Sequence, residues 1–344
     1  MKQVVAVALI LLLLFFLLPF LLLGGGSGGE SVLPLDRPVA TPAPSGPLDT
    51  ERTIDVLQKD GSVTTMTMGD YLWSVVAAEM PASFELEALK AQTVAARTYA
   101  LRKMTYGSAN HPDADVCTDH TCCQAYITPE DAQANWGENA QVYTARIQNA
   151  ISGTDGIVAL YDGKPIDAVF FSSAAGQTVD AVEVWGNSVP YLTGVESPEG
   201  EEVPNYHTTV TLSAEEFKTA FLEAHPDADL SGTPDSWLGN ITPNSAGGVE
   251  SIVVGGITVS GTEMRTLFSL RSTSFTVTEQ DGQFTFSVTG YGHGVGMSQY
   301  GANAMAKEGS TYEEILKWYY TGISLETWQG EDSASPSPSP APAA

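Results

Sequence analysis

Basic side chains are scarce in this 344-residue chain. It contains 15 Lys and Arg residues against 41 Asp and Glu residues, which gives a formal net charge of −26 and an isoelectric point of about 4.3. Proteins that bind nucleic acids or other polyanions need clustered basic side chains, so this balance argues against that class. It does not argue against a glycan ligand, because sugars are recognised through hydrogen bonds and aromatic surfaces.

Several catalytic signatures are also missing. The glycines at 292, 294 and 296 are not followed by an acidic ribose partner, and no alternating strand–helix pattern precedes them, which excludes a dinucleotide site. The serines at 172 and 173 lack the strained nucleophile turn of serine hydrolases. The sequence contains no internal repeat.

Cysteine occurs only three times, at Cys117, Cys122 and Cys123. An odd number in an exported protein indicates either one disulfide with a free thiol or a metal site. His111 lies six residues before Cys117, and His120 lies between the thiols, a clustering that suits tetrahedral Zn²⁺. Spacing alone leaves open a disulfide between Cys117 and Cys123.

The N-terminus carries a long apolar run from residue 4 to 23, preceded by Lys2. Its length matches a membrane span of about 20 residues and exceeds the apolar core of most signal peptides. No cysteine follows it, which argues against a lipoprotein. We therefore expect an uncleaved single-pass anchor over 1–23, a flexible linker over 24–47 and an extracytoplasmic body, with a cleaved signal peptide as the alternative. The Ser- and Pro-rich stretch 331–344 predicts a disordered tail.

The remaining residues, 48–330, show mixed periodicity. Helix patterns occur over 69–80, 84–105, 130–151, 213–224 and 311–320. Strand patterns occur over 157–161, 166–171, 207–211, 250–254, 273–278 and 283–288, with hairpin turns at Asp162-Gly163 and Asp281-Gly282. Helices separated from paired strands predict an α+β fold, with a second lobe over 205–275.

One acidic residue stands out within these patterns. Glu79 falls in the middle of the apolar face of the predicted helix 69–80, and Pro81 ends that helix. A carboxylate in this setting is either buried at a cost or held at the edge of a cleft where burial raises its pKa, and a raised pKa is what a general acid requires. The competing interpretation is a surface residue in the last turn of a short helix.

Six ordered blocks between about residues 65 and 325 resemble the SpoIID/LytB family. They are YLWSVVAAEMPASFELEALKAQTVAARTYAL (71–101), HPDADVC…CCQAY (111–126), FFSSAAGQT (170–178), VWGNSVPYL (184–192), SGTEMRTLFSLRSTSF (260–275) and YGHGVGMSQYGANAMAKEG (291–309). The resemblance implies a membrane-anchored lytic transglycosylase that cleaves peptidoglycan during sporulation and engulfment. It places the catalytic glutamate at Glu79, in a glycan-binding cleft between two lobes.

The resemblance also implies ligands and partners. The family's zinc site matches His111, Cys117 and Cys123, and Cys122, His120 or water could supply the fourth ligand of a structural Zn²⁺. Expected partners are peptidoglycan glycan strands, a SpoIIP-like amidase and a SpoIIM-like membrane protein, in the space facing the septum. The residues expected to contact the glycan are Arg97, Ser172, Ser173, His293, Ser298, Gln299 and Tyr300.

Two other functions remain compatible with the sequence. The wider family includes amidase enhancers, which would bind glycan and stimulate another wall enzyme without cleaving the strand. A scaffold could also recruit an amidase through the segment 205–275. Retention of Glu79 within the apolar helix favours the enzyme.

Overall fold

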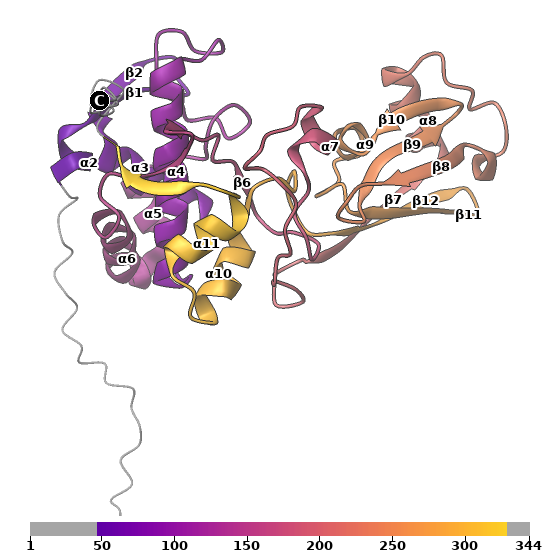
Figure 1. Ribbon diagram of the computed structural model, residues 1–344. Helices are drawn as coiled ribbons and strands as arrows, with labels where there is room; N and C mark the ends of the chain where they lie inside the picture. Colours follow the sequence, from indigo (N-terminus) through magenta and orange to yellow (C-terminus); the bar gives the residue numbers. More distant parts are fainter. Residues whose placement is uncertain (1–46, 329–344) are drawn as a thin grey trace, which may run out of the picture. The chain divides into compact units, whose positions relative to one another are not determined.

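The computed structural model describes residues 47–328 and has the predicted mixed α+β fold, with several antiparallel sheets (Figure 1). The α-helices are α2 (Pro47–Glu51), α3 (Met68–Glu79), α4 (Leu86–Tyr106), α5 (Pro129–Trp136), α6 (Ala140–Ser152), α7 (Ala181–Trp185), α8 (Ala214–Ala224), α9 (Gly261–Leu267), α10 (Gln299–Lys307) and α11 (Tyr312–Tyr319). Two short 3₁₀ helices are η1 (Gly137–Asn139) and η2 (Pro234–Ser236). None of the helices within 47–328 combines the length and apolar content needed to cross a bilayer. The predicted anchor over 1–23, the linker before residue 47 and the tail over 331–344 lie outside the described residues.

The strands form five small sheets. They are β1 (Thr53–Leu57), β2 (Val63–Thr67), β3 (Val116–Cys117), β4 (Ile157–Tyr161), β5 (Lys164–Pro165), β6 (Phe170–Phe171), β7 (His207–Ser213), β8 (Leu238–Pro243), β9 (Val249–Val254), β10 (Ile257–Ser260), β11 (Phe275–Gln280), β12 (Gln283–Thr289), β13 (Met297–Ser298) and β14 (Ser324–Thr327). Their orders are β2-β1-β3, β10-β9-β8, β11-β12-β7, β13-β6 and β14-β4-β5. Most pairs are antiparallel, whereas β1 with β3 and β6 with β13 are parallel.

Helix α3 begins and ends where its sequence dictates. The Thr67 side chain caps it by accepting the Asp70 N–H, and it ends at Glu79 with Met80 in an extended conformation. Extended backbone is expected at Met80 because the ring of Pro81 disfavours a helical residue before it. The result is that Glu79 stands at the last position of the helix.

Helix α4 lies at the centre of the first hydrophobic core. Nearly every residue from Ala88 to Leu101 is buried, and the alanines among them let neighbouring elements approach closely. Helices α3, α6, α10 and α11 and strand β4 all pack against it. A second core forms among the elements from β7 to β12, around Phe217 and the aromatic rings stacked on it. This core includes the β11–β12 hairpin as well as residues within 205–275.

Two hairpin turns form as predicted. Asp162 and Gly163 join β4 to β5, and Asp281 and Gly282 join β11 to β12; all four have positive φ, as these tight turns require.

Two predicted elements differ from the structure. The predicted helix 130–151 is interrupted at Gly137, whose φ of 54° an α-helix does not allow, and it divides into α5, η1 and α6. The predicted strand 166–171 is paired only at Phe170 and Phe171, because β5 ends at Pro165 and the chain then turns toward the pocket described below.

Candidate active site

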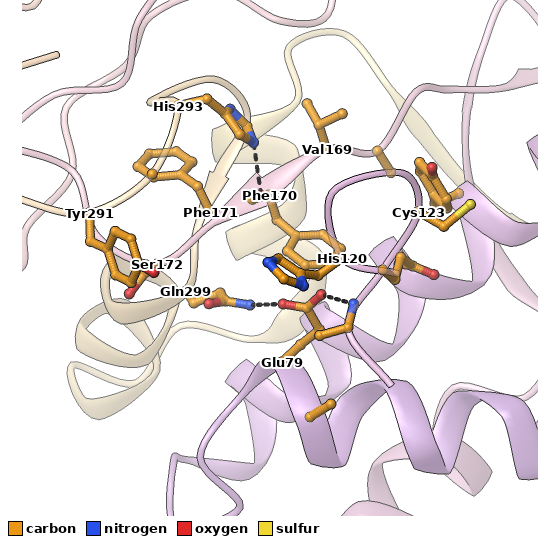
Figure 2. A pocket seen from close by; sticks show the side chains of 16 residues that line it. Glu79, His120, Cys123, Val169, Phe170, Phe171, Ser172, Tyr291, His293 and Gln299 are labelled. Atoms are coloured by element: carbon orange, nitrogen blue, oxygen red, sulfur yellow. Dashed lines mark hydrogen bonds between the residues drawn. The ribbon is translucent and has the colours of Figure 1, made fainter. Parts of the chain in front are cut away.

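A pocket of about 450 Å³ opens beside the end of α3 (Figure 2). Segments far apart in the sequence contribute to its wall. They are Ala78 and Glu79, His120, Cys123 to Ala125, Ala168 to Ser172, Tyr291 to His293, Tyr99 and Gln299. Glu79 is the single carboxylate among these lining residues, which makes it the candidate for acid–base chemistry in this pocket.

Both oxygens of Glu79 are held by donors on other segments. Oε1 accepts the Ala125 backbone N–H at 2.6 Å, and Oε2 accepts the Gln299 Nε2 amide at 3.3 Å (Figure 2). Donors on both sides of the carboxyl group fix its orientation toward the pocket.

The environment of Glu79 raises its pKa above the ordinary value of 4.5, and burial is the main cause. The hydrogen bonds from Ala125 and Gln299 oppose this shift because they favour the charged form, and nearby His120 does so to a smaller extent. Desolvation outweighs these contacts, so the group retains its proton to higher pH than a free glutamate does.

Gln299 reaches Glu79 because the preceding glycines allow close approach of the backbone. A Cβ atom added at Gly292 would lie 2.6 Å from the Phe171 Cβ, and one at Gly296 would lie 2.2 Å from the Val169 carbonyl oxygen. Both glycines have positive φ, which other residues rarely adopt. This approach lets β13 pair with β6 and places Gln299, the first residue of α10, at the pocket.

His293 lines the pocket, but both of its ring nitrogens are occupied. Nε2 lies 3.1 Å from the Phe170 carbonyl oxygen, to which it donates, and Nδ1 accepts the Val295 N–H at 3.2 Å. Burial lowers its pKa to about 4, with a smaller contribution from the charge of Arg265, so the ring is neutral near pH 7. His293 therefore shapes the wall of the pocket and has no free nitrogen for proton transfer.

The predicted catalytic residue and glycan contacts divide into those that lie in the pocket and those that do not. Glu79, Ser172, His293 and Gln299 come together in the pocket. Tyr300 instead packs edge-on against Phe84 and lines a separate hollow.

Ser173 and Ser298 lie behind the wall of the pocket, where they are buried. The Ser298 hydroxyl donates to Glu199, a carboxylate that is only 4% exposed and also accepts the Ala174 N–H and the Ser197 hydroxyl. This network joins the loop that carries Ser197 and Glu199 to Ala174 and Ser298, which lie close in the chain to Ser172 and Gln299. Glu199 was not singled out from the sequence, because its acidic neighbours resemble a solvated loop.

The structure does not bring Arg97 into the pocket. Its guanidinium is completely buried and makes two hydrogen bonds to Asp49, from Nε at 2.9 Å and from Nη2 at 2.5 Å. A third bond runs from Nη1 to the Ile157 carbonyl oxygen. Arg97 thus ties α4 to α2 and β4, and its donors are not available to a ligand.

The predicted metal ligands form a compact cluster. The ligand atoms of His111, Cys117, Cys122 and Cys123 all lie within 4.8 Å of one another, and the three cysteines are free thiols. The His111 Nδ1 donates to the Ala114 carbonyl oxygen at 2.9 Å, which leaves Nε2 facing Cys123 Sγ at 3.1 Å. One imidazole nitrogen and three thiols form a donor set that suits tetrahedral Zn²⁺. Cys122 is the fourth residue of this cluster, whereas His120 lies in the pocket wall.

The cluster and the pocket share a segment of chain. Cys123 belongs to both, and Ala125, two residues later, donates to Glu79. Tyr71 and Tyr99 hold the same segment through bonds to the Gln124 side chain and the Cys122 carbonyl oxygen. The conformation of this cysteine loop (117–125) therefore determines the position of the Ala125 N–H group.

Comparison with known proteins gives consistent matches. Residues 58–161 match the SpoIID family, described as a stage II sporulation protein. The chain is 38% identical over 266 residues to stage II sporulation protein D of Bacillus subtilis (strain 168), covering 77% of this chain and 76% of that protein. It is likewise 38% identical over 266 residues to the protein of that name from Bacillus amyloliquefaciens, covering 77% and 75%. It is also 32% identical over 309 residues to the amidase enhancer of Bacillus subtilis (strain 168), which covers 75% of this chain and 40% of that protein.

Proposed function

This chain belongs to the SpoIID family of stage II sporulation proteins, and we propose that it is a lytic transglycosylase that cleaves peptidoglycan glycan strands. The observation that carries the proposal is the Glu79 carboxyl group, held by two donors in the pocket, with its pKa raised by burial. A positioned carboxyl group with a raised pKa is suited to act as the general acid that cleavage of a glycosidic bond needs.

The reaction proceeds in two proton transfers. The Glu79 carboxylic acid protonates the oxygen that links N-acetylmuramic acid to N-acetylglucosamine, and the bond from C1 of the muramic residue to that oxygen breaks. The Glu79 carboxylate then takes the proton of the C6 hydroxyl of the same muramic residue. The C6 oxygen bonds to C1 and leaves a 1,6-anhydro end, so no water is consumed.

The composition of the pocket favours this chemistry over hydrolysis. Most glycoside hydrolases use two carboxylates, one as acid and one as nucleophile or base. Among the residues described as lining this pocket, Glu79 is the single carboxylate. An intramolecular nucleophile removes the need for a second carboxylate, because it is already next to C1.

We further propose that His111, Cys117, Cys122 and Cys123 hold a structural Zn²⁺. Bound zinc would cross-link the cysteine loop and thereby fix the Ala125 N–H against Glu79. The ion would supply folding energy and take no part in bond cleavage.

The cellular setting proposed here follows from family membership and from the sequence. The N-terminal run would anchor the protein in the membrane, with residues 48–330 acting on the septal wall during engulfment. A SpoIIP-like amidase and a SpoIIM-like membrane protein would be its partners.

The assignment of Glu79 is tested by Glu79→Gln in the full-length protein. Gln retains an acceptor for the Ala125 N–H but carries no transferable proton, so release of 1,6-anhydro products should fall by about 10²- to 10⁴-fold. Products from purified glycan strands are identified by mass spectrometry, with the exposed Glu250→Gln as the matched control. Anhydro products released by Glu79→Gln at the parental rate would refute the assignment, and reducing ends from the parent protein would indicate hydrolysis.

A second function is favoured by the similarity to the amidase enhancer. In that case the pocket would bind glycan without cleaving it. The parent protein would then release no sugar product in the same experiment, but it would accelerate peptide release by an added wall amidase. Glu79→Gln would retain that stimulation.

The zinc proposal has its own test. Purified protein should contain about one Zn²⁺ per chain by elemental mass spectrometry, and removal by a chelator should lower the melting temperature. Cys122→Ser should weaken zinc binding, whereas Thr121→Ser, an adjacent exposed change, should not. Chelation that changes neither zinc content nor stability would count against a metal site.

A further inference from the structure

Glu199 is a buried carboxylate that the proposed reaction does not use. It is only 4% exposed, and no ion pair forms to it within residues 47–328. Burying a carboxylate without a cation is unfavourable unless hydrogen-bond donors compensate its charge. The donors that surround Glu199 therefore show which segments of the chain it holds together.

Within the described part of the chain, the hydrogen-bond partners of Glu199 are all donors. Oε1 accepts the Ala174 backbone N–H at 2.6 Å and the Ser298 hydroxyl, and Oε2 accepts the Ser197 hydroxyl at 2.5 Å. Because the single proton of Ser197 is used in this bond, the Tyr319 hydroxyl, 2.6 Å away, donates to Ser197. An amide NH₂ group in place of either oxygen would face a group that already donates, so this network favours a carboxylate at residue 199.

Helix α10 begins on this network. Its N-cap is Ser298, whose hydroxyl accepts the Gly301 N–H at 3.2 Å while it donates to Glu199. A Cβ atom added at Gly301 would lie 2.6 Å from Glu199 Oε2 and 2.3 Å from Ser197 Oγ, so the first turn approaches this closely because residue 301 has no side chain. A negative charge is favourable at the N-terminus of a helix, and this contributes to holding Glu199 without a cation.

The residue after Ser298 is Gln299, whose side-chain amide donates to Glu79 across the pocket (Figure 2). One peptide unit thus separates the residue bound to Glu199 from the residue bound to Glu79. The Gln299 Nε2 also lies 3.5 Å from Oε1 of Gln92, a buried side chain on α4. The bond from Gln299 to Glu79 is 3.3 Å long, near the upper limit for a hydrogen bond, so a small displacement at the start of α10 would break it.

We propose that Glu199 is a positioning residue of the pocket: through Ser298 it fixes the start of α10, and it thereby keeps the Gln299 amide on Glu79. Glu199 is not among the residues that line the pocket, so its effect on the reaction passes through Gln299. This inference rests on the proposed function of the pocket. The bond between Gln299 and Glu79 can nevertheless be observed without any cleavage.

The test compares Glu199→Gln, Gln299→Met and the double variant in the full-length protein. Glu199→Gln keeps the volume of the side chain but disrupts the network, so kcat for release of anhydro products should fall about three- to tenfold, the equivalent of one hydrogen bond. Adding Glu199→Gln to Gln299→Met should cause no further loss, because the side chain through which it acts is already absent. A purely structural role would give the same loss in both backgrounds.

The pH profile separates positioning from a direct effect of charge. Loss of the Gln299 donor raises the pKa of Glu79, so the alkaline limb of kcat/KM should move to higher pH in Glu199→Gln, as in Gln299→Met. Removal of a nearby negative charge alone would lower the pKa of Glu79 and move the limb to lower pH. The direction of the shift therefore distinguishes the two effects.

Two further variants complete the comparison. Ser298→Ala removes the link between Glu199 and α10 and should reproduce the shift of the limb; it takes the place of Glu199→Gln if that variant does not fold. Glu196→Gln is the matched control, because Glu196 is an exposed carboxylate three residues earlier on the same loop. Its kcat and its pH profile should match those of the parent protein.

Crystal structures of the parent and of Glu199→Gln give the measurement that needs no cleavage. The distance from Gln299 Nε2 to Glu79 Oε2 should exceed about 3.5 Å in the variant. An unchanged distance in folded Glu199→Gln would overturn the proposal, as would additive losses in the double variant or a limb that moves to lower pH. A longer distance in the variant, together with no anhydro product from the parent, would uphold the positioning role and reject only the transglycosylase.

Discussion

Two buried polar sites lie beside helix α4, and they differ in how far neighbouring residues compensate their charges. At one, Arg97 and Asp49 are both fully buried and pair with each other through two hydrogen bonds. At the other, Glu79 accepts two hydrogen bonds from uncharged donors and remains partly exposed in the pocket. Removing one partner of a buried ion pair leaves an uncompensated charge, whereas a carboxyl group for which desolvation outweighs its hydrogen bonds keeps a raised pKa and can exchange a proton.

The largest expected effect on stability comes from breaking the buried ion pair between Arg97 and Asp49. Asp49→Asn leaves the buried Arg97 charge uncompensated, which should lower the free energy of unfolding by about 3–5 kcal/mol. Urea unfolding followed by circular dichroism measures the loss. Asp60→Asn, on an exposed turn, should stay within about 0.5 kcal/mol of the parent.

A double substitution separates the loss of the ion pair from the cost of one unpaired buried charge. Asp49→Leu with Arg97→Met replaces the buried pair by apolar side chains, and it should recover most of the stability lost in Asp49→Asn. Glycan cleavage per folded molecule should match the parent. Loss of cleavage in a stable double variant would mean that Arg97 acts on the substrate after all.

The next effect concerns Glu79 and the pH dependence of cleavage. Gln299→Met removes the donor to Glu79 Oε2, which favours the carboxylate, so the pKa of Glu79 should rise further. A general acid works while protonated, and kcat/KM falls as pH increases through its pKa. The alkaline limb of the pH profile should therefore move to higher pH. Gln141→Met, an exposed change on α6, is the control, and a limb that stays in place or moves to lower pH would contradict the role of Gln299.

Local patterns predicted helices α3 and α4, but they missed α10, which carries Gln299, and the long-range pairs within the site. Helix α3, its end at Pro81 and the Asp281-Gly282 turn follow from residues adjacent in the chain. The polar face of α4 gave no sign that Arg97 pairs with Asp49, 48 residues earlier. Spacing likewise could not show that Gln299 meets Glu79 across 220 residues, or that Cys122 rather than His120 joins the thiol cluster. These pairings depend on tertiary approach, which composition and periodicity do not encode.

The smallest effect comes from a second ion pair on the same helix. Lys90 and Glu87 lie 2.6 Å apart, but their side chains are 21% and 30% exposed, whereas those of Arg97 and Asp49 are completely buried. Water already compensates much of each charge, so Lys90→Met should cost only about 0.5 kcal/mol of unfolding free energy. Salt at 1 M should remove most of that small difference while leaving the loss in Asp49→Asn nearly unchanged, because salt screens partly exposed charges far more than buried ones. Equal salt sensitivity of the two variants would show that burial does not determine how much each ion pair contributes to the free energy of unfolding.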